Sequence, residues 1–311
     1  MIEVEKLTKY YGDFMAIEDV SFEVKKGEVL GFLGPNAAGK TTTMRILTGF
    51  MPPSSGTARV AGYDILDHSL EVRRQIGYMP ETVPLYTDMT VDSYLDFSAT
   101  LRGVDKKRKE KRIDEVMDIC RIGDYADTLI GKLSKGFRQR VGIAQAILHE
   151  PEVLILDEPT IGIDPIQVVE TRRLIRGLGG EHTVILSTHI LPEVSMVCEK
   201  VIIINEGRVV AIDRPENLSA RLMGSDRIQM EVRGPAGDVA STIRQVKGVR
   251  DVTWETFGDR SRFNVDCQPG GDLRQQLAAA VVQKGWDLLE LQSSRMSLED
   301  IFLQLTTKEE L

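Results

Sequence analysis

The stretch Gly34-Pro35-Asn36-Ala37-Ala38-Gly39-Lys40-Thr41 has the residue types and the spacing of a loop that binds phosphate. It matches the pattern G-x-x-x-x-G-K-[ST], in which glycines allow consecutive backbone N–H groups to converge on an anion. Lys40 would bring its charge to the β- and γ-phosphates, and the hydroxyl of Thr41 would be a ligand of Mg²⁺. The stretch therefore predicts a nucleotide site.

Two carboxylates, Asp157 and Glu158, end the apolar run Val153–Leu156, which is typical of a buried strand. A parallel sheet delivers such side chains to its carboxyl edge, where a phosphate loop after another strand also lies. There Asp157 would hold Mg²⁺, usually through water, and Glu158 would be the general base toward an attacking water. Alone, the two acids could equally be a solvated strand end, but the phosphate loop upstream favours hydrolysis.

Short apolar runs alternate with helical patterns from Ile2 to about Leu218, and these elements must position the acids and the loop. Continuous apolar character is typical of strands that are buried on both faces. The clearest such runs are Val29–Leu33, Val153–Leu156, Val184–Leu186 and Val201–Ile204. The fold class predicted is α/β with a mostly parallel sheet.

A helical subdomain is expected between about residues 81 and 150, inserted into the α/β domain. Its clearest helical patterns are Val91–Leu101, Asp105–Cys120 and Phe137–Leu148. In the last of these, apolar residues recur at helical spacing from Val141 to Leu148, so we expect that face to be core rather than a binding surface.

A second domain is predicted beyond about Gly224. Residues 1–223 would form the nucleotide-binding domain and residues 224–311 an accessory domain. Strand and helix patterns in the accessory domain follow the order β-α-β-β-α-β, with a last helix at Leu298–Leu305. That order predicts a small α+β module of the ferredoxin-like kind.

Composition narrows the class of protein. With 311 residues, 42% hydrophobic and 28% charged, the chain is typical of a globular protein of about two domains. No apolar run approaches the roughly 18 residues of a membrane span, and no secretory signal is visible at Met1. The net charge of −8 argues against broad nucleic-acid binding. Three scattered cysteines, Cys120, Cys198 and Cys267, fit a reducing compartment and disfavour a zinc site.

Between the two nucleotide signals lies Leu133-Ser134-Lys135-Gly136-Phe137-Arg138-Gln139-Arg140, which resembles LSGGQ, the signature motif of ABC-type ATPases. The order of motifs from Met1 to Leu218 is also similar to that family. It runs through Tyr11, the phosphate loop, Ile76–Glu81, the signature, Asp157-Glu158, Ile161–Asp164 and His189.

The resemblance implies a role for each matching position. Glu158, His189 and Lys40 would be catalytic, and Thr41, Glu81 and Asp157 would surround Mg²⁺. ATP would be held by Tyr11, Gly34, Pro35, Asn36, Ala37, Ala38, Gly39, Lys40, Thr41, Thr42 and Glu81. Without the resemblance, Tyr11 and His189 could be ordinary structural residues.

The resemblance also implies that the ATP site is shared between two subunits. Ser134, Lys135 and Gly136 would meet the ATP that is held on the opposite subunit, and Asp164 would couple the two sites. Considered alone, Ser134 is a candidate helix N-cap.

Four positions depart from the usual pattern of the family. Glu81 stands in place of glutamine, Lys135 in place of a signature glycine, Phe137 in place of the signature glutamine, and Ala37 in place of a loop glycine. Together with Ser297-Leu298-Glu299-Asp300-Ile301-Phe302, they resemble the ATPases of ABC-2-type exporters, including the gliding-motility-associated group. One hypothesis is that Lys135 partly balances the charge of Glu81 across the dimer.

The resemblance therefore implies an ATP-hydrolysing subunit of a membrane transporter. It would form a homodimer, or pair with a closely related ATPase subunit, beneath separate integral membrane permease subunits. Its place would be cytoplasmic, peripheral on the inner face of the cell membrane, with no nucleic acid as partner. The alternatives are a soluble ABC-type ATPase of DNA repair or translation and a nucleotide-sensing regulator.

Overall fold

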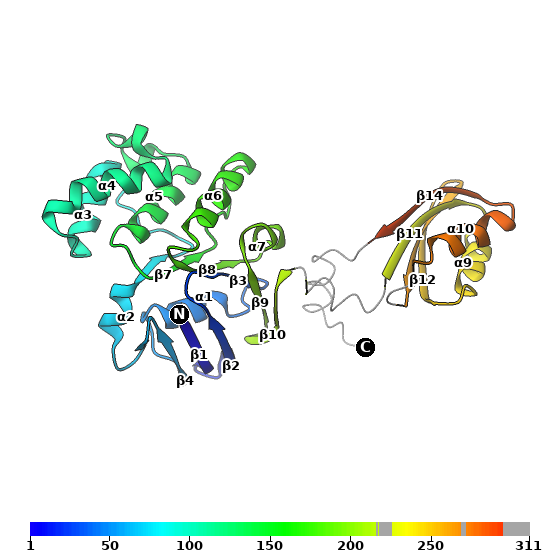
Figure 1. Cartoon of the computed structure of the whole chain (residues 1–311), viewed down its shortest axis with the longest axis horizontal. Coiled ribbons are helices and arrows are strands. Elements are labelled where there is room, and N and C mark those ends of the chain that lie inside the picture. Colours follow the sequence, from blue (N-terminus) through cyan, green and yellow to red (C-terminus); the bar gives the residue numbers. More distant parts are fainter. Residues whose placement is uncertain (216, 218–225, 269–271, 295–311) are drawn as a thin grey trace. The chain divides into compact units, whose positions relative to one another are not determined.

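The computed structural model describes residues 1–215, 217, 226–268 and 272–294 (Figure 1). The chain divides into two compact units, Met1–Pro215 and Glu216–Leu311. The boundary expected near Gly224 lies outside the described residues, and the division falls shortly before it.

A six-stranded sheet forms the centre of the first unit, in the order β10-β9-β3-β8-β7-β6. Its strands are β3 (Val29–Leu33), β6 (Ile76–Met79), β7 (Val153–Asp157), β8 (Thr183–Thr188), β9 (Lys200–Asn205) and β10 (Arg208–Asp213). All neighbours are parallel except β9 and β10. Strands β3, β7 and β8 are buried along their whole length, so the predicted parallel sheet is confirmed.

A second, antiparallel sheet in the first unit was not predicted. Its strands are β1 (Ile2–Tyr11), β2 (Phe14–Val24), β4 (Ser55–Val60) and β5 (Tyr63–Asp64), in the order β2-β1-β4-β5. Register shifts interrupt the pairing of β1 with β2, and Lys6 and Asp19 have left-handed backbones. These irregularities break the period-two alternation by which a half-buried strand is found in a sequence.

Helix α1 (Lys40–Leu47) packs into a core that both sheets share. Its buried residues Met44, Ile46 and Leu47 belong to the same cluster as Phe32 of the larger sheet and Val60 of the smaller one. The loop that leads into α1 is therefore anchored by apolar packing on two sides.

Helices α3 (Val91–Leu101), α4 (Lys106–Cys120) and α5 (Lys135–Ile147) form the expected helical part, which Figure 1 shows at one end of the first unit. Threonine, aspartate and serine side chains at Thr90, Asp105 and Ser134 cap the three N-termini. The predicted core face of α5, from Val141 to Leu148, is buried.

Three further helices of this unit were not predicted: α2 (Ser69–Gln75), α6 (Pro165–Leu178) and α7 (Leu191–Val197). The start of α6 carries a clear signal, because Asp164 caps it and Pro165 occupies its first turn. Helices α6 and α7 follow strands β7 and β8, so they begin just beyond the edge of the sheet where Asp157 and His189 lie.

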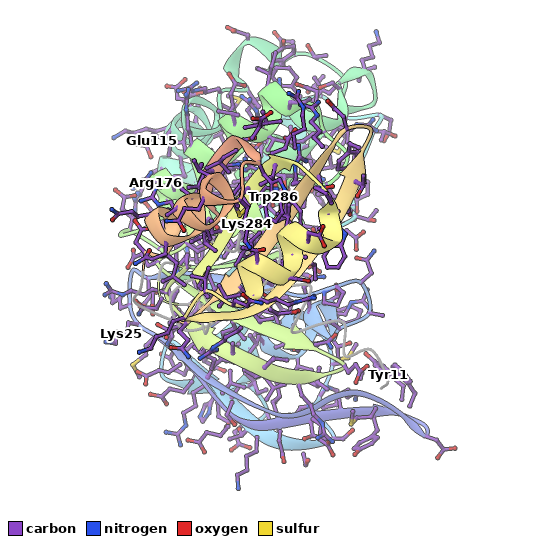
Figure 2. All side chains as sticks on the ribbon, turned by 90° about the vertical axis from the view of Figure 1, so that its right-hand side faces the viewer. Tyr11, Lys25, Glu115, Arg176, Lys284 and Trp286 are labelled. Atoms are coloured by element: carbon purple, nitrogen blue, oxygen red, sulfur yellow. The ribbon has the colours of Figure 1, made fainter. Side chains whose placement is uncertain are left out.

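The second unit is a ferredoxin-like module, as predicted. It contains β11 (Asp226–Arg233), α9 (Ala236–Arg244), β12 (Val249–Phe257), β13 (Arg260–Cys267), α10 (Arg274–Gln283) and β14 (Asp287–Ser294). The sheet is antiparallel in the order β12-β13-β11-β14, and both helices share its apolar core (Figure 1). Trp286, labelled in Figure 2, lies between α10 and β14 and packs against Gly234. The helix expected at Leu298–Leu305 and the motif Ser297–Phe302 lie outside the described residues.

Among the described residues, no helix has both the length and the hydropathy that a bilayer span requires. Cys120, Cys198 and Cys267 are all buried.

Candidate functional site

The phosphate-type loop connects β3 to α1 and lines a cavity of about 350 Å³. The other walls come from the β1–β2 hairpin, from the segment after β6 and from the segment after β7. The lining residues are Tyr11, Phe14, Ala16, Asn36, Ala37, Ala38, Gly39, Lys40, Thr41, Thr42, Glu81, Glu158 and Ile161. Gly39 has a φ of 103°, which L side chains rarely adopt, so the turn into α1 requires glycine.

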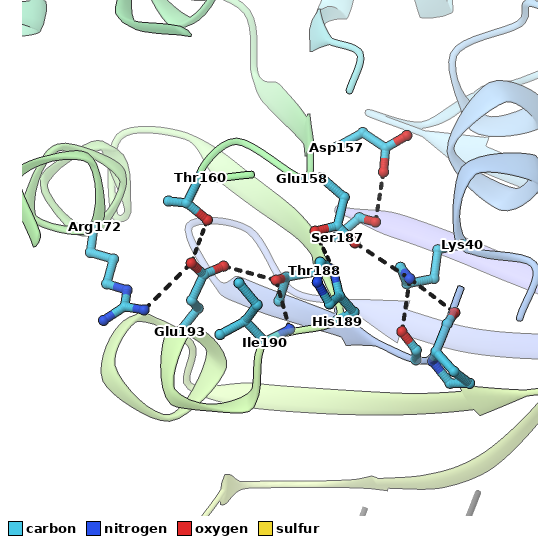
Figure 3. Close-up of polar contacts among 12 residues, drawn as sticks. Lys40, Asp157, Glu158, Thr160, Arg172, Ser187, Thr188, His189, Ile190 and Glu193 are labelled. Atoms are coloured by element: carbon cyan, nitrogen blue, oxygen red, sulfur yellow. Dashed lines mark hydrogen bonds and ion pairs between the residues drawn. The ribbon is translucent and has the colours of Figure 1, made fainter. Parts of the chain in front are cut away.

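Lys40 is folded over its own loop. Its side chain is only 6% exposed, and Nζ donates to the carbonyl oxygens of Gly34 at 2.8 Å and Pro35 at 3.1 Å. The same Nζ lies 3.4 Å from Oε1 of Glu158 (Figure 3). The expected phosphate ligand and the expected base are thus brought into direct contact.

Glu158 is held at the centre of a polar cluster. Its Oε2 lies 2.9 Å from Nδ1 of His189, and its backbone N–H donates to the carbonyl of Ser187 at 2.9 Å (Figure 3). Its φ of 51° is uncommon for a residue with a side chain and persists only when the surroundings fix it. The structure therefore places Glu158 and His189, expected from separate motifs, at one point.

Asp157 is buried at the end of β7, beside the cavity. One oxygen, Oδ1, accepts a hydrogen bond of 2.7 Å from Oγ of Ser187, and the other, Oδ2, is buried without a hydrogen-bond partner among the described residues. An unsatisfied carboxylate oxygen fits a cation with its water shell, as expected for Mg²⁺. Burial, and then the Asp157 carboxylate, raises the pKa of nearby Tyr78 to about 12, so this phenol stays neutral at physiological pH.

Sequence reasoning missed Ser187, although a signal for it exists. Strands β7 and β8 pair in parallel with Asp157 opposite Ser187, and β3 pairs with β8 so that Leu33 faces Thr188. Ser187 and Thr188 are a polar pair at the end of an otherwise apolar strand. Because another apolar strand ends in Asp157, this pair is predicted to lie with Asp157 at one edge of the sheet.

Tyr11 lies at the end of β1, and the residue is 45% exposed (Figure 2). Its hydroxyl contacts Sδ of Met51, and Nζ of Lys9 lies 5.7 Å from its ring centroid. Phe14, directly opposite Tyr11 across the hairpin, is exposed and lines the same cavity. The cavity thus has two aromatic side chains at its mouth, and only Tyr11 was expected.

The signature residues lie outside this cavity. Ser134 caps α5 by accepting from the N–H of Phe137, and Gly136 packs against Gln167 of α6. Asp164 also has a local role, since its carboxylate caps α6. Ser134 and Asp164 therefore each stabilise a helix start within their own chain.

Lys135 reaches toward the segment after β7 in the same chain. Its Nζ packs over Gly162, which has a φ of 66°, and a side chain at position 162 would meet the ammonium group. Lys135 also lines a second cavity, of about 380 Å³, together with Glu81 and Ile161. The two unusual charges, Glu81 and Lys135, thus border one space within a single chain.

The family model, the relatives and the solved structures that match this chain all indicate the same family. The family model described as ABC transporter matches residues 17–161. The linearmycin resistance ATP-binding protein LnrL of Bacillus subtilis is 33% identical over 98% of this chain and 98% of its own length. The bacitracin transport ATP-binding protein BcrA of Bacillus licheniformis is 36% identical over 98% of this chain and 97% of its own length. A solved ATP-binding subunit of an ABC transporter superposes with a TM-score of 0.65 and 31% identity, covering 71% of this chain and 93% of that one.

Proposed function

This chain belongs to the ABC transporter family, as an ATP-binding and ATP-hydrolysing subunit, and we propose on this premise that two copies close over ATP beneath a separate membrane permease. The main support for the proposal is the contact of Glu158, in the wall of the loop cavity, with both Lys40 and His189. Relatives named for transport and resistance match nearly the whole chain, which favours transport over DNA repair, translation or nucleotide sensing.

The proposed chemistry is attack of water on the γ-phosphate of ATP. Glu158 accepts the proton of the water, and His189 holds the carboxylate and aligns the water. Lys40 exchanges its contacts with Gly34 and Pro35 for phosphate oxygens and stabilises the charge that develops there. Thr41, Asp157 and Glu81 would hold Mg²⁺, which supplies further charge neutralisation at the phosphates.

The adenine would stack on Tyr11, with Phe14 as a second apolar surface at the mouth of the cavity. The backbone from Gly34 to Thr42 would bind the phosphates. These roles use residues that line the cavity.

The location of the signature residues supports a site that two subunits share. Ser134 is exposed, and neither Ser134 nor Gly136 lines the cavity of its own chain. We propose that both meet the γ-phosphate held by the opposite copy, with Lys135 and Asp164 at the same junction. Bound ATP then becomes part of the interface, so association depends on ATP.

The dimer is tested with Glu158→Gln, which should bind ATP but hydrolyse it slowly. With saturating ATP and Mg²⁺ this variant is expected to sediment as a dimer, and with ADP as a monomer. Adding Ser134→Arg should restore the monomer in ATP, because the long side chain blocks closure without entering the cavity of its own chain. A strictly monomeric Glu158→Gln variant in saturating ATP would contradict the proposal.

A permease segment would dock on the helical part. Exposed apolar side chains gather there, with the rings of Tyr86 and Phe97 edge to face at 5.6 Å and Leu101 on the same helix as Phe97. The neighbouring second cavity is lined by Val83 and Leu85. Exposed apolar patches of this kind mark surfaces that meet a protein partner.

Co-purification from membranes tests the docking surface. The tagged chain should carry a multi-span protein with it, and Phe97→Asp should reduce the yield of that protein by about tenfold, since a charge opposes burial of the patch. Leu70→Asp, at another exposed apolar position on α2, is the matched control. Recovery of nucleic acid or of only soluble partners from the unmodified chain would count against the proposal.

We place the chain at the inner face of the cell membrane, as a peripheral subunit of an exporter. Export is favoured because one relative matched over nearly its whole length is named for linearmycin resistance and another for bacitracin transport. The second unit lies within the matched length of both relatives, so it belongs to the same functional subunit.

A further inference from the structure

Glu193 is a buried carboxylate that none of the motifs includes. It lies in the first turn of α7 and is 1% exposed. A charged group so deeply buried is tolerated only when it is paired and hydrogen-bonded. The groups that contact the Glu193 carboxylate therefore indicate which segments it stabilises.

The contacts of Glu193 join three different segments. Oε2 accepts a hydrogen bond of 2.8 Å from Oγ1 of Thr188, and Oε1 accepts one from Oγ1 of Thr160 (Figure 3). Oε1 also lies 3.4 Å from Nη2 of Arg172 on α6. Both threonines are buried, so the hydrogen bonds are shielded from water.

Two of these segments carry the hydrolytic residues. Thr160 lies two positions after Glu158, and Thr188 lies immediately before His189. Oγ1 of Thr188 also accepts from the backbone N–H of Ile190, so the turn that carries His189 is fixed on both sides. The left-handed backbone of Glu158 needs such restraint to persist.

We propose that Glu193 is a positioning residue for ATP hydrolysis: its carboxylate fixes the segment of Glu158 relative to the segment of His189, and Arg172 ties both to α6. It touches neither nucleotide nor water and acts through the two threonines. Sequence reasoning missed it, although an acidic residue four positions after His189, in an otherwise apolar turn, is a visible signal.

Glu193→Gln tests the inference, which rests on the proposed roles of Glu158 and His189. It keeps the shape but removes the charge opposite Arg172 and one acceptor for a threonine hydroxyl. We expect kcat to fall about 10–100-fold, as a small misplacement of reacting groups can cause, with KM for ATP within about twofold of the unmodified protein. The phosphate loop makes none of these contacts, so ATP binding is spared.

Thr188→Val and Thr188→Ser form a matched pair that keeps the Glu193 carboxylate and its contact with Arg172. Valine removes the hydroxyl and should lower kcat at unchanged KM, whereas serine keeps it and should restore kcat. If Glu193→Gln does not fold, as judged by its thermal transition, the two Thr188 variants alone test the inference. Glu115→Gln, which breaks an exposed carboxylate–arginine pair on α4, should leave turnover unchanged.

A double-mutant cycle with His189→Ala separates positioning from general support of the fold. If Glu193 acts through alignment, Glu193→Gln should lower kcat less in the His189→Ala background than in the unmodified protein. Near-normal kcat in both Glu193→Gln and Thr188→Val, or a raised KM at normal kcat, would overturn the inference. Near-normal turnover in Glu158→Gln would instead overturn the proposed function itself.

Discussion

Glu158→Gln is expected to bind ATP and to lose roughly 10²–10⁴-fold in turnover, the usual contribution of a positioned proton acceptor. The amide has the same shape and can still accept a hydrogen bond from His189, so the local geometry is preserved. It cannot take a proton from water, so the chemical step fails while the cavity remains intact. Steady-state phosphate release and equilibrium binding of ATP measure the two effects separately.

The matched control for this variant is Glu152→Gln. Glu152 is an exposed carboxylate that lies 3.9 Å from Lys26, away from the cavity lining. Its loss should leave both turnover and ATP affinity unchanged. Turnover of Glu158→Gln close to that of the control would mean that another group accepts the proton.

Lys40→Ala should weaken ATP binding about 10–100-fold, because hydrogen bonds from a charged donor are worth about 1.5–3 kcal/mol. Turnover should fall as well, since we propose that the same ammonium group stabilises the charge on the phosphate in the transition state. Calorimetric titration with a non-hydrolysable ATP analogue gives the affinity, and phosphate release gives the rate.

Lys26→Ala is the control for Lys40→Ala, because Lys26 is an exposed lysine with a carboxylate neighbour. It should bind ATP as the unmodified chain does. If Lys40→Ala also bound ATP with unchanged affinity and lost only turnover, Lys40 would act in the transition state alone, and its assignment to nucleotide binding would be wrong.

The sequence predicts the buried parts of this fold well and the half-buried parts poorly. Runs such as Val29–Leu33 and Val153–Leu156 are apolar throughout, so they can be found without knowing their partners. The antiparallel sheet was not predicted because bulges at Lys6 and Asp19 interrupt the alternation of apolar and polar residues in its strands. Only the register between strands shows which faces of such segments are buried.

For the site, motifs predict which residues matter but not which residues support them. Lys40, Asp157 and Glu158 follow from local patterns and His189 from the family's order of motifs; in the structure Glu158 contacts both Lys40 and His189. Ser187 was missed because its contact with Asp157 joins residues that are 30 positions apart in the chain. The polar pair Ser187-Thr188 at the end of an apolar strand indicates the edge of the sheet, but only the pairing of β7 with β8 shows that Ser187 contacts Asp157.

The three oxygen contacts of Lys40 have a consequence for which molecules the loop admits. Two carbonyls and one carboxylate already satisfy this ammonium group, so an incoming ligand must outcompete them to draw it away. An uncharged nucleoside lacks the means to do so, and each added phosphate strengthens the pull. We therefore expect the affinity of the loop for a nucleotide to depend on its negative charge more than on the shape of its base.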